Sequence, residues 1–301
     1  MYFDAGKIIA RLRKQRGISQ EKLAGLSDRS NLSRIERGQQ GISRVLLEFY
    51  LDRLGYSLER FTPFLLSDDE ASIYALRDEI EDYIANDNVY KAKKTLAEME
   101  ALDAFKQGLH KQFLLTCKAG ILIKTDIQQT SELLHEAIVI TIEDFDEDKI
   151  QSYLLARNDI KIINMMATIH SKSDELDRAI SLLEGVATVI RQKYMDAYEK
   201  ARSLTLTLYN LSCHLGAQKR YMEEIDILDE AIAEGQANRC YGLLPKLFYN
   251  KAYCLFMLDK PEEAKPLMLN AYYTCITFGL HGLAKTMKTN VYNNFKYAIP
   301  D

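Results

Sequence analysis

Apolar residues recur with a helical period along almost the whole chain, and no stretch shows the alternation with period two that a β-strand requires. Within residues 1–66 the pattern predicts five short helices, over about 4–16, 19–26, 29–37, 43–54 and 58–65. Gly17 and Gly38 are placed to end the first and third helices, and Ser19 to cap the second. Their apolar positions predict one small core, made of Ile8, Ile9, Leu12, Leu23, Ala24, Leu26, Leu32, Ile35, Val45, Leu46, Phe49, Leu51, Leu54 and Phe61.

From Asp68 onward, amphipathic helices follow one another with short polar turns between them. Three stretches, starting at Ala167, Ser212 and Ala252, share the same successive spacings of three, six, three, four and three between positions that are mostly small or apolar. Two weaker copies lie upstream, and the final positions of the five copies are 38, 49, 45 and 40 residues apart. This internal repetition predicts stacked helix-turn-helix pairs of unequal length, closed by a last helix over about 283–297.

The net charge of the chain, −4, conceals an asymmetry between its two parts. Residues 1–66 contain 12 Lys and Arg against 7 Asp and Glu, a net charge of +5. The remainder contains 27 basic and 36 acidic residues, a net charge of −9. A basic head on an acidic body is the distribution expected when only the head binds nucleic acid.

Two segments of the head, GISQEKLAGL and RSNLSRIERG, resemble the helix-turn-helix of the Cro/repressor-like (XRE) family. The tail ERGQQGISRVLLEFYLDRLGYSLERF resembles the version found in Rgg-type peptide-responsive regulators. The connection between the second and third helices, at Ser27 and Asp28, is shorter than is usual in that family. Beyond the head, the repeat spacing, with small residues favoured at the first, fourth and last positions, resembles the tetratricopeptide repeat.

Together these features resemble the Rgg/PlcR-like (RRNPP) group of transcription regulators, and the resemblance implies an all-α chain. Residues 1–66 would form a five-helix, lambda-repressor-like helix-turn-helix domain. Residues 67–301 would form a right-handed tetratricopeptide-like solenoid for peptide sensing and dimerisation. In that family a short signalling peptide binds the concave groove and alters DNA affinity, which is a form of quorum sensing. The implied protein is a cytoplasmic homodimer whose partners are double-stranded operator DNA and a short peptide.

The third predicted helix carries the side chains best suited to reading DNA bases. In such motifs the start of this helix enters the major groove, where Arg can pair with guanine and Asn with adenine. We therefore expect base contacts from Arg29, Ser30, Asn31 and Arg34. Phosphate contacts are expected from Gln20, Arg37 and Arg44. Any one of these arginines also fits a solvated helix face, and Glu36 is expected to brace an arginine within the fold.

The repeats contain polar and aromatic residues suited to binding an extended peptide. Asn offers both a donor and an acceptor to a peptide backbone, and Asn210 and Asn250 occupy the same place in adjacent repeats. Aromatic residues would form apolar pockets, and lysines would hold a carboxylate. The full set of peptide-binding candidates is Lys161, Asn164, Asn210, Lys246, Tyr249, Asn250 and Tyr253. The alternative interpretation is that the asparagines are merely exposed and the tyrosines belong to the core.

The sequence argues against other classes of function. It contains no Gly-rich phosphate loop and no nucleophile elbow, and its five cysteines and five histidines lack metal-ligand spacing, so no enzymatic activity, metal or cofactor is expected. No apolar run reaches the length of a membrane span. One alternative stays open: a repeat scaffold that binds or inhibits a signalling protein, as Rap-like proteins do, with DNA binding as a second role.

Overall fold

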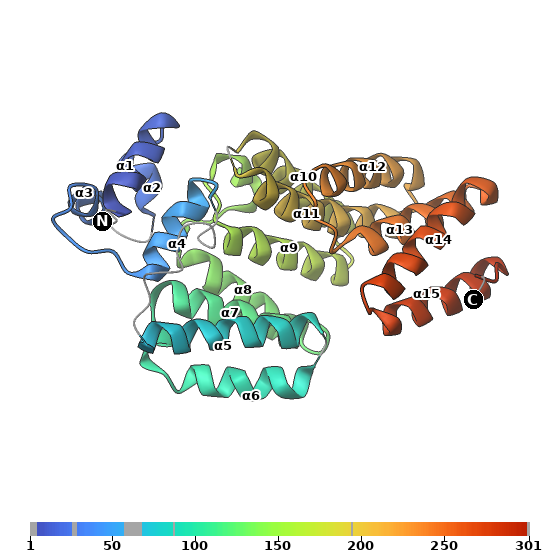
Figure 1. Ribbon diagram of the computed structural model, residues 1–301, viewed down its shortest axis with the longest axis horizontal. Helices are drawn as coiled ribbons and strands as arrows, with labels where there is room; N and C mark the ends of the chain where they lie inside the picture. The colour runs from blue at the N-terminus through green and yellow to red at the C-terminus, as the bar shows by residue number, and fades with distance from the viewer. Residues whose placement is uncertain (1–4, 26–28, 57–67, 87, 194, 300–301) are drawn as a thin grey trace. The chain divides into compact units, whose positions relative to one another are not determined.

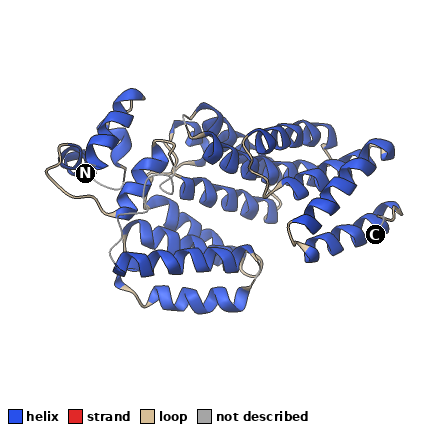
Figure 2. Ribbon diagram, in the orientation of Figure 1, coloured by secondary structure: helices blue, strands red, loops and turns tan. Residues whose placement is uncertain are grey.

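The computed structural model describes residues 5–25, 29–56, 68–86, 88–193 and 195–299, without the side chains of residues 68–71. The regular elements in these ranges are all helices, which confirms the predicted all-α class (Figure 2). The chain divides into two compact units. Unit 1 comprises residues 1–173 and 192–196, and unit 2 comprises residues 174–191 and 197–301. The predicted boundary between residues 66 and 67 falls outside the described residues.

Unit 1 begins with the head, in which the described residues form four helices (Figure 1). They are α1 (Ala5–Gln15), α2 (Gln20–Ala24), α3 (Arg29–Glu36) and α4 (Arg44–Arg53). As predicted, Ser19 caps α2, because its side chain accepts a hydrogen bond from the Lys22 N–H at 3.1 Å. Gly17 and Gly38, with φ values of 64° and 70°, follow α1 and α3 at the predicted stops.

The core of the head is close to the predicted one. Ile9, Leu23 and Leu32 are completely buried, and Ile35 is 1% exposed. Tyr50 is also completely buried, although it was not among the predicted core residues. The predicted connection at 27–28, the helix at 58–65 and the core positions Leu26 and Phe61 lie outside the described residues.

The rest of unit 1 consists of helices that pack on their neighbours in the chain. They are α5 (Asp68–Ala85), α6 (Val89–Glu100), α7 (Gly108–Leu122), α8 (Ile127–Val139) and α9 (Arg157–Lys172), with 3₁₀ helices η2 (Asp103–Lys106) and η3 (Glu147–Ser152). α5 contacts α6 and α7, and α7 in turn contacts α8 and α9. One core cluster between them is built on Ile80, Met99, Phe105 and Phe113. α4 of the head also packs against α7.

Unit 2 is a second stack of helices (Figure 1). It contains α10 (Leu176–Gln192), α11 (Ala197–Ala217), α12 (Tyr221–Ala237), α13 (Leu244–Met257), α14 (Pro261–Thr277) and α15 (His281–Phe295). From α11 to α15 each helix contacts the next, and α11 also contacts α13. Such nearest-neighbour packing is typical of a helical-repeat array.

The repeat register predicted from the sequence agrees with the backbone. In each of the three clear copies, the third position opens the second helix of a pair: Leu176, Tyr221 and Pro261 are the first residues of α10, α12 and α14. Two residues earlier the backbone is left-handed in every copy, with φ values of 64° at Asp174, 61° at Lys219 and 58° at Asp259. The small first and last positions of the copies are fully buried. Equal backbone geometry at equal register indicates that the copies are structural repeats.

The described ranges contain neither a membrane-spanning helix nor a cluster of metal-binding side chains. None of the helices there combines the length and apolar character needed to cross a bilayer. Nor do three or more His, Cys, Asp or Glu side chains gather there as a metal site would need.

Candidate functional site

The outer face of α3 presents the residues predicted to read DNA. Leu32 and Ile35 anchor the opposite face in the core of the head. Arg29, Ser30 and Arg34 are exposed, and Asn31 is half-buried. The Arg34 guanidinium donates to the Ser30 carbonyl at 3.3 Å, and that of Arg37 donates to the Ser33 carbonyl at 3.1 Å. These arginines therefore lie along an exposed helix surface from which they can reach a ligand.

A part-buried ion pair beneath this face joins α1, α2 and α3. Arg13 donates to both oxygens of Glu36, from Nε at 2.6 Å and from Nη2 at 2.7 Å. Gln20 Nε2 donates to the same carboxylate at 2.8 Å. Burial alone would raise the pKa of Glu36, but the hydrogen bonds from Arg13 and Gln20 outweigh it and hold that pKa below its usual value. The prediction that Glu36 braces an arginine is confirmed.

Two residues predicted to contact phosphates have partners inside unit 1. The amide of Gln20 donates to Glu36, as described above. The guanidinium of Arg44 lies 3.8 Å from the centroid of the Tyr74 ring, which brings α4 and α5 together. Their contacts with DNA stay predictions. These partners could not be predicted from local sequence, because neither is a close neighbour in the chain.

In unit 2, five of the peptide-binding candidates lie on α11 and α13. We call Asn210, Lys246, Tyr249, Asn250 and Tyr253 the asparagine face; all five are half-buried. Asn250 Nδ2 lies 3.5 Å from Ser212 Oγ and 3.6 Å from Cys213 Sγ, which joins α13 to α11.

Aromatic and amide contacts continue the asparagine face towards α15. The rings of Tyr253 and Phe295 meet edge to face, with centroids 5.2 Å apart. Burial raises the pKa of Tyr249, and a hydrogen bond with Asn290 offsets part of that rise. The first helices of successive pairs, α11 and α13, and the last helix, α15, therefore lie side by side.

One further residue, which was not among the predicted ones, belongs to this surface. Tyr209 lies beside Asn210, and the Lys246 ammonium is 5.7 Å from the centroid of its ring. Tyr209–Asn210 and Tyr249–Asn250 are the same dipeptide at the same register of adjacent repeats. That recurrence was the available signal, since it places a tyrosine beside each asparagine.

The remaining two peptide-binding candidates, Lys161 and Asn164, lie on α9 in unit 1. Lys161 Nζ donates to Glu81 Oε1 at 2.8 Å. Asn164 is only 3% exposed, and its amide donates to the Ile160 carbonyl at 2.8 Å. Both side chains therefore have structural partners, and their role in binding a peptide stays a prediction.

Comparisons with known proteins match both parts of the chain. A helix-turn-helix family model matches residues 9–61, and the model of the RNPP family C-terminal domain matches residues 131–297. A comparison with curated proteins gave no match.

Several solved structures share this fold. PlcR of Bacillus thuringiensis, in complex with the peptide PapR7 and DNA, is 18% identical with a TM-score of 0.62, over 94% of this chain and 98% of PlcR. ComR of S. thermophilus, in complex with DNA and its signalling peptide ComS, is 18% identical with a TM-score of 0.52, over 95% of this chain and 98% of ComR. The Streptococcus dysgalactiae SHP pheromone receptor Rgg2 is 17% identical with a TM-score of 0.52, over 96% of this chain and 99% of Rgg2.

At these identities the solved structures establish the fold alone, whereas the family models establish descent. The RNPP C-terminal model covers more than half of the chain, and the helix-turn-helix model covers most of the head. The chain therefore belongs to the RNPP family, the peptide-responsive transcription regulators that its sequence resembles.

Proposed function

We propose that the head of this regulator recognises a specific operator through α3. The observation that carries this proposal is the two-sided character of α3. Leu32 and Ile35 fix one side in the core, while Arg29, Ser30 and Arg34 stand exposed on the other. The Arg13–Glu36 ion pair fixes the orientation of the helix from beneath. Side chains held in this way can meet base edges in the major groove without losing a folded conformation.

We further propose that the asparagine face of unit 2 binds a short, extended peptide. Asn210 and Asn250 would bond to its backbone, and Tyr249 and Tyr253 would contact its apolar side chains. The solved structures of PlcR and ComR named above contain a peptide and DNA, which supports this assignment by likeness of fold. In this proposal the protein acts in the cytoplasm, where an imported peptide and the chromosome both reach it.

The peptide can regulate only if it binds one conformation of the protein more tightly than another. The protein is proposed to act as a homodimer, because two heads read half-sites about one helical turn apart on the same face of DNA. Dimerisation also doubles the number of contacts that one conformational change can make or break.

The DNA part of the proposal is tested by titrating a fluorescent duplex from the chain's own upstream region with the wild-type protein. Arg34→Ala is expected to weaken specific binding by about 1–3 kcal/mol, because a bidentate base contact is lost. The control is Lys93→Ala, which removes the same charge from an exposed position on α6. Equal affinity of the wild type for operator and random duplexes would refute the assignment of α3.

The peptide part is tested by repeating the titration with synthetic peptides from small reading frames beside the gene. Asn210→Ala and Asn250→Ala are each expected to abolish the change in DNA affinity that peptide causes, while basal DNA binding persists. Asn270→Ala on α14 is the control, because Asn270 is exposed and outside the asparagine face. If both face variants respond to peptide as the wild type does, the peptide site lies elsewhere.

A further inference from the structure

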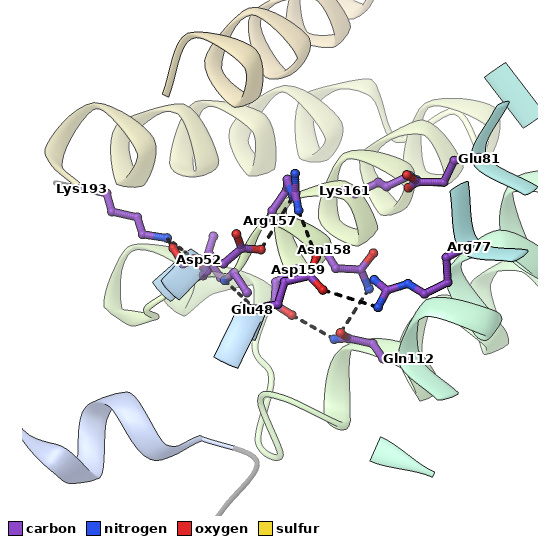
Figure 3. Close-up of polar contacts among 12 residues, drawn as sticks. Glu48, Asp52, Arg77, Glu81, Gln112, Arg157, Asn158, Asp159, Lys161 and Lys193 are labelled. Atoms are coloured by element: carbon purple, nitrogen blue, oxygen red, sulfur yellow. Dashed lines mark hydrogen bonds and ion pairs between the residues drawn. The ribbon is translucent and has the colours of Figure 1, made fainter. Parts of the chain in front are cut away.

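The connection between α10 and α11 lies within residues 192–196, which belong to unit 1, whereas residues 174–191 and 197–301 form unit 2. Lys193 Nζ donates to the backbone carbonyl of Asp52, at the end of α4, at 2.8 Å (Figure 3). It also donates to the Leu155 carbonyl at 2.5 Å. The Asp196 N–H donates to the Gly55 carbonyl, just beyond α4. Two residues of one connection therefore bind the backbone at the end of the same helix.

The ammonium of Lys193 is held in this contact by two backbone carbonyls and is not a solvated surface charge. Its side chain is part-buried, and loss of water lowers the pKa of the ammonium to about 8. The carboxylates of Asp52 and Asp159 oppose that fall, whereas the guanidiniums of Arg53 and Arg16 reinforce it. A cation withdrawn from water is costly unless it is hydrogen-bonded, so removing its carbonyl partners would be strongly unfavourable.

The other side of α4 is fixed by ion pairs with α5 and α9. Arg157 contacts Glu48 at 3.2 Å and Asp52 at 3.7 Å (Figure 3). Tyr74 donates to Glu48 at 2.8 Å. Arg77 lies 3.6 Å from the same glutamate. The carboxylates of α4 thus have partners that are independent of Lys193. Lys193 instead donates a hydrogen bond to a backbone carbonyl of α4, that of Asp52.

The last turn of α4 carries Arg53, which holds the end of α2. Arg53 is 5% exposed, and its guanidinium stacks 4.7 Å from the centroid of the Phe49 ring. Its Nη1 donates to the carbonyls of Lys22 and Leu23, at 3.4 and 3.3 Å. Gly25 follows directly, with a φ of 51°, and a Cβ there would lie 2.2 Å from Arg53 Nη1. Only glycine leaves room for this guanidinium, so the two positions are matched.

We propose that Lys193 and Asp196 form a strap that fixes the last turn of α4 and, through Arg53, the end of α2. The strap would make the DNA affinity of the head depend on the state of α10 and α11, the helices that it joins. This inference rests on the proposed function, because it assumes that the head binds DNA. The strapped state is the one that binds DNA, since here the DNA-reading residues of α3 stand exposed and the end of α2 before them is capped.

The physical basis is a coupling between two parts of one chain. Any movement of α10 or α11 that displaces their connection must break the hydrogen bonds to Asp52 and Gly55, or carry α4 along. In either case Arg53 shifts relative to the carbonyls of α2. A head free to change the spacing between α2 and α3 loses the fixed geometry on which base contacts depend.

The test compares Lys193→Met, which keeps the length of the side chain but removes its donors, with Lys296→Met. Lys296 is a matched control, because its Nζ also donates to a backbone carbonyl, that of Asn293, and it is not part of the connection between α10 and α11. Two measurements are made on the full chain. The first is the affinity for the operator duplex and for a random duplex, and the second is hydrogen–deuterium exchange of the amides of α2.

Lys193→Met is expected to bind the operator at least about tenfold more weakly, with random DNA unaffected, and to exchange faster in α2 but not in α12. Lys296→Met is expected to match the wild type in both measurements. If Lys193→Met lacks the wild-type circular dichroism spectrum, Lys193→Gln replaces it, because a neutral amide is a milder change. Weaker operator binding and faster exchange in α2 are then expected for Lys193→Gln. Wild-type operator affinity and wild-type α2 exchange in the folded variant would overturn the strap. Absence of specific binding by the wild type would instead overturn the proposed function. Hydrogen–deuterium exchange in α2 would still test the strap in that case.

Discussion

A carboxyl group buried in unit 2 should make the stability of this protein fall as the pH rises. Glu224 on α12 is 4% exposed and occupies the repeat position that Ala179 and Ala264 fill in the other two clear copies. A hydrogen bond joins its carboxyl group to the thiol of Cys254. Gly216 leaves room for that group, because a Cβ at residue 216 would lie 2.6 Å from Glu224 Oε2. Burial raises the pKa of Glu224 from 4.5 to about 7.

The sign and size of the effect follow from the difference in pKa between the folded and unfolded states. The folded chain holds the proton of Glu224 more tightly, so the stabilising contribution is complete below about pH 4.5 and is lost as the pH rises through about 7. A shift of one pKa unit corresponds to about 1.4 kcal/mol, so roughly 2–3 kcal/mol should be lost between about pH 5 and pH 8. Glu224→Gln carries a neutral isostere and should lack this loss.

The assay is urea denaturation followed by circular dichroism, at several values between about pH 5 and pH 8. The free energy of unfolding of Glu224→Gln minus that of the wild type should rise by roughly 2–3 kcal/mol across this range. Comparison of the two proteins at each pH cancels the titration of all other groups, including His214, whose pKa is lowered by burial. The control, Glu223→Gln, alters the exposed neighbour on the same helix and should leave the pH dependence unchanged. A difference that stays constant from pH 5 to pH 8 would refute the reasoning.

Two further predictions concern buried polar networks in unit 1. Glu36→Ala should destabilise the head by about 3 kcal/mol, because it leaves the side chain of Arg13, which is 11% exposed, without its carboxylate partner. Thermal unfolding checks this prediction, with the exposed variant Glu21→Ala as control, and equal melting temperatures of the two variants would contradict it. Asp159→Ala should cost at least about 2 kcal/mol, because Gln112 Nε2 at 2.9 Å and Thr141 Oγ1 at 2.7 Å lose a fully buried acceptor. Thermal unfolding checks this prediction too, with the exposed variant Asp148→Ala as control. A melting temperature equal to that of the control would show that water or another residue replaces the carboxylate.

Much of the fold could be predicted because its signals are local. The cap at Ser19, the glycines at residues 17 and 38 and the helical period each depend on residues a few positions apart. The repeat register was also visible, since the same small positions are buried in every copy. The outer face of α3 followed from the same periodicity, because burying Leu32 and Ile35 leaves the intervening polar residues exposed.

The partners of charged side chains could not be predicted in the same way. Arg44 and Lys161 were expected to bind ligands, but in the structure they meet Tyr74 and Glu81. A basic residue on a helix has the same local pattern whether it faces solvent, a ligand or another helix. Its partner is selected by the packing of elements that are distant in the chain.

The sequence by itself determined that the chain is a helix-turn-helix followed by helical repeats, and which faces of those helices are buried. Only the tertiary structure decided that Lys193 reaches the carbonyl of Asp52, 141 residues away, and that Arg53 caps α2. The physical reason is that periodicity and capping are set by neighbours along the backbone. Hydrogen bonds between distant residues form only where the packed helices bring a donor and an acceptor within about 3 Å.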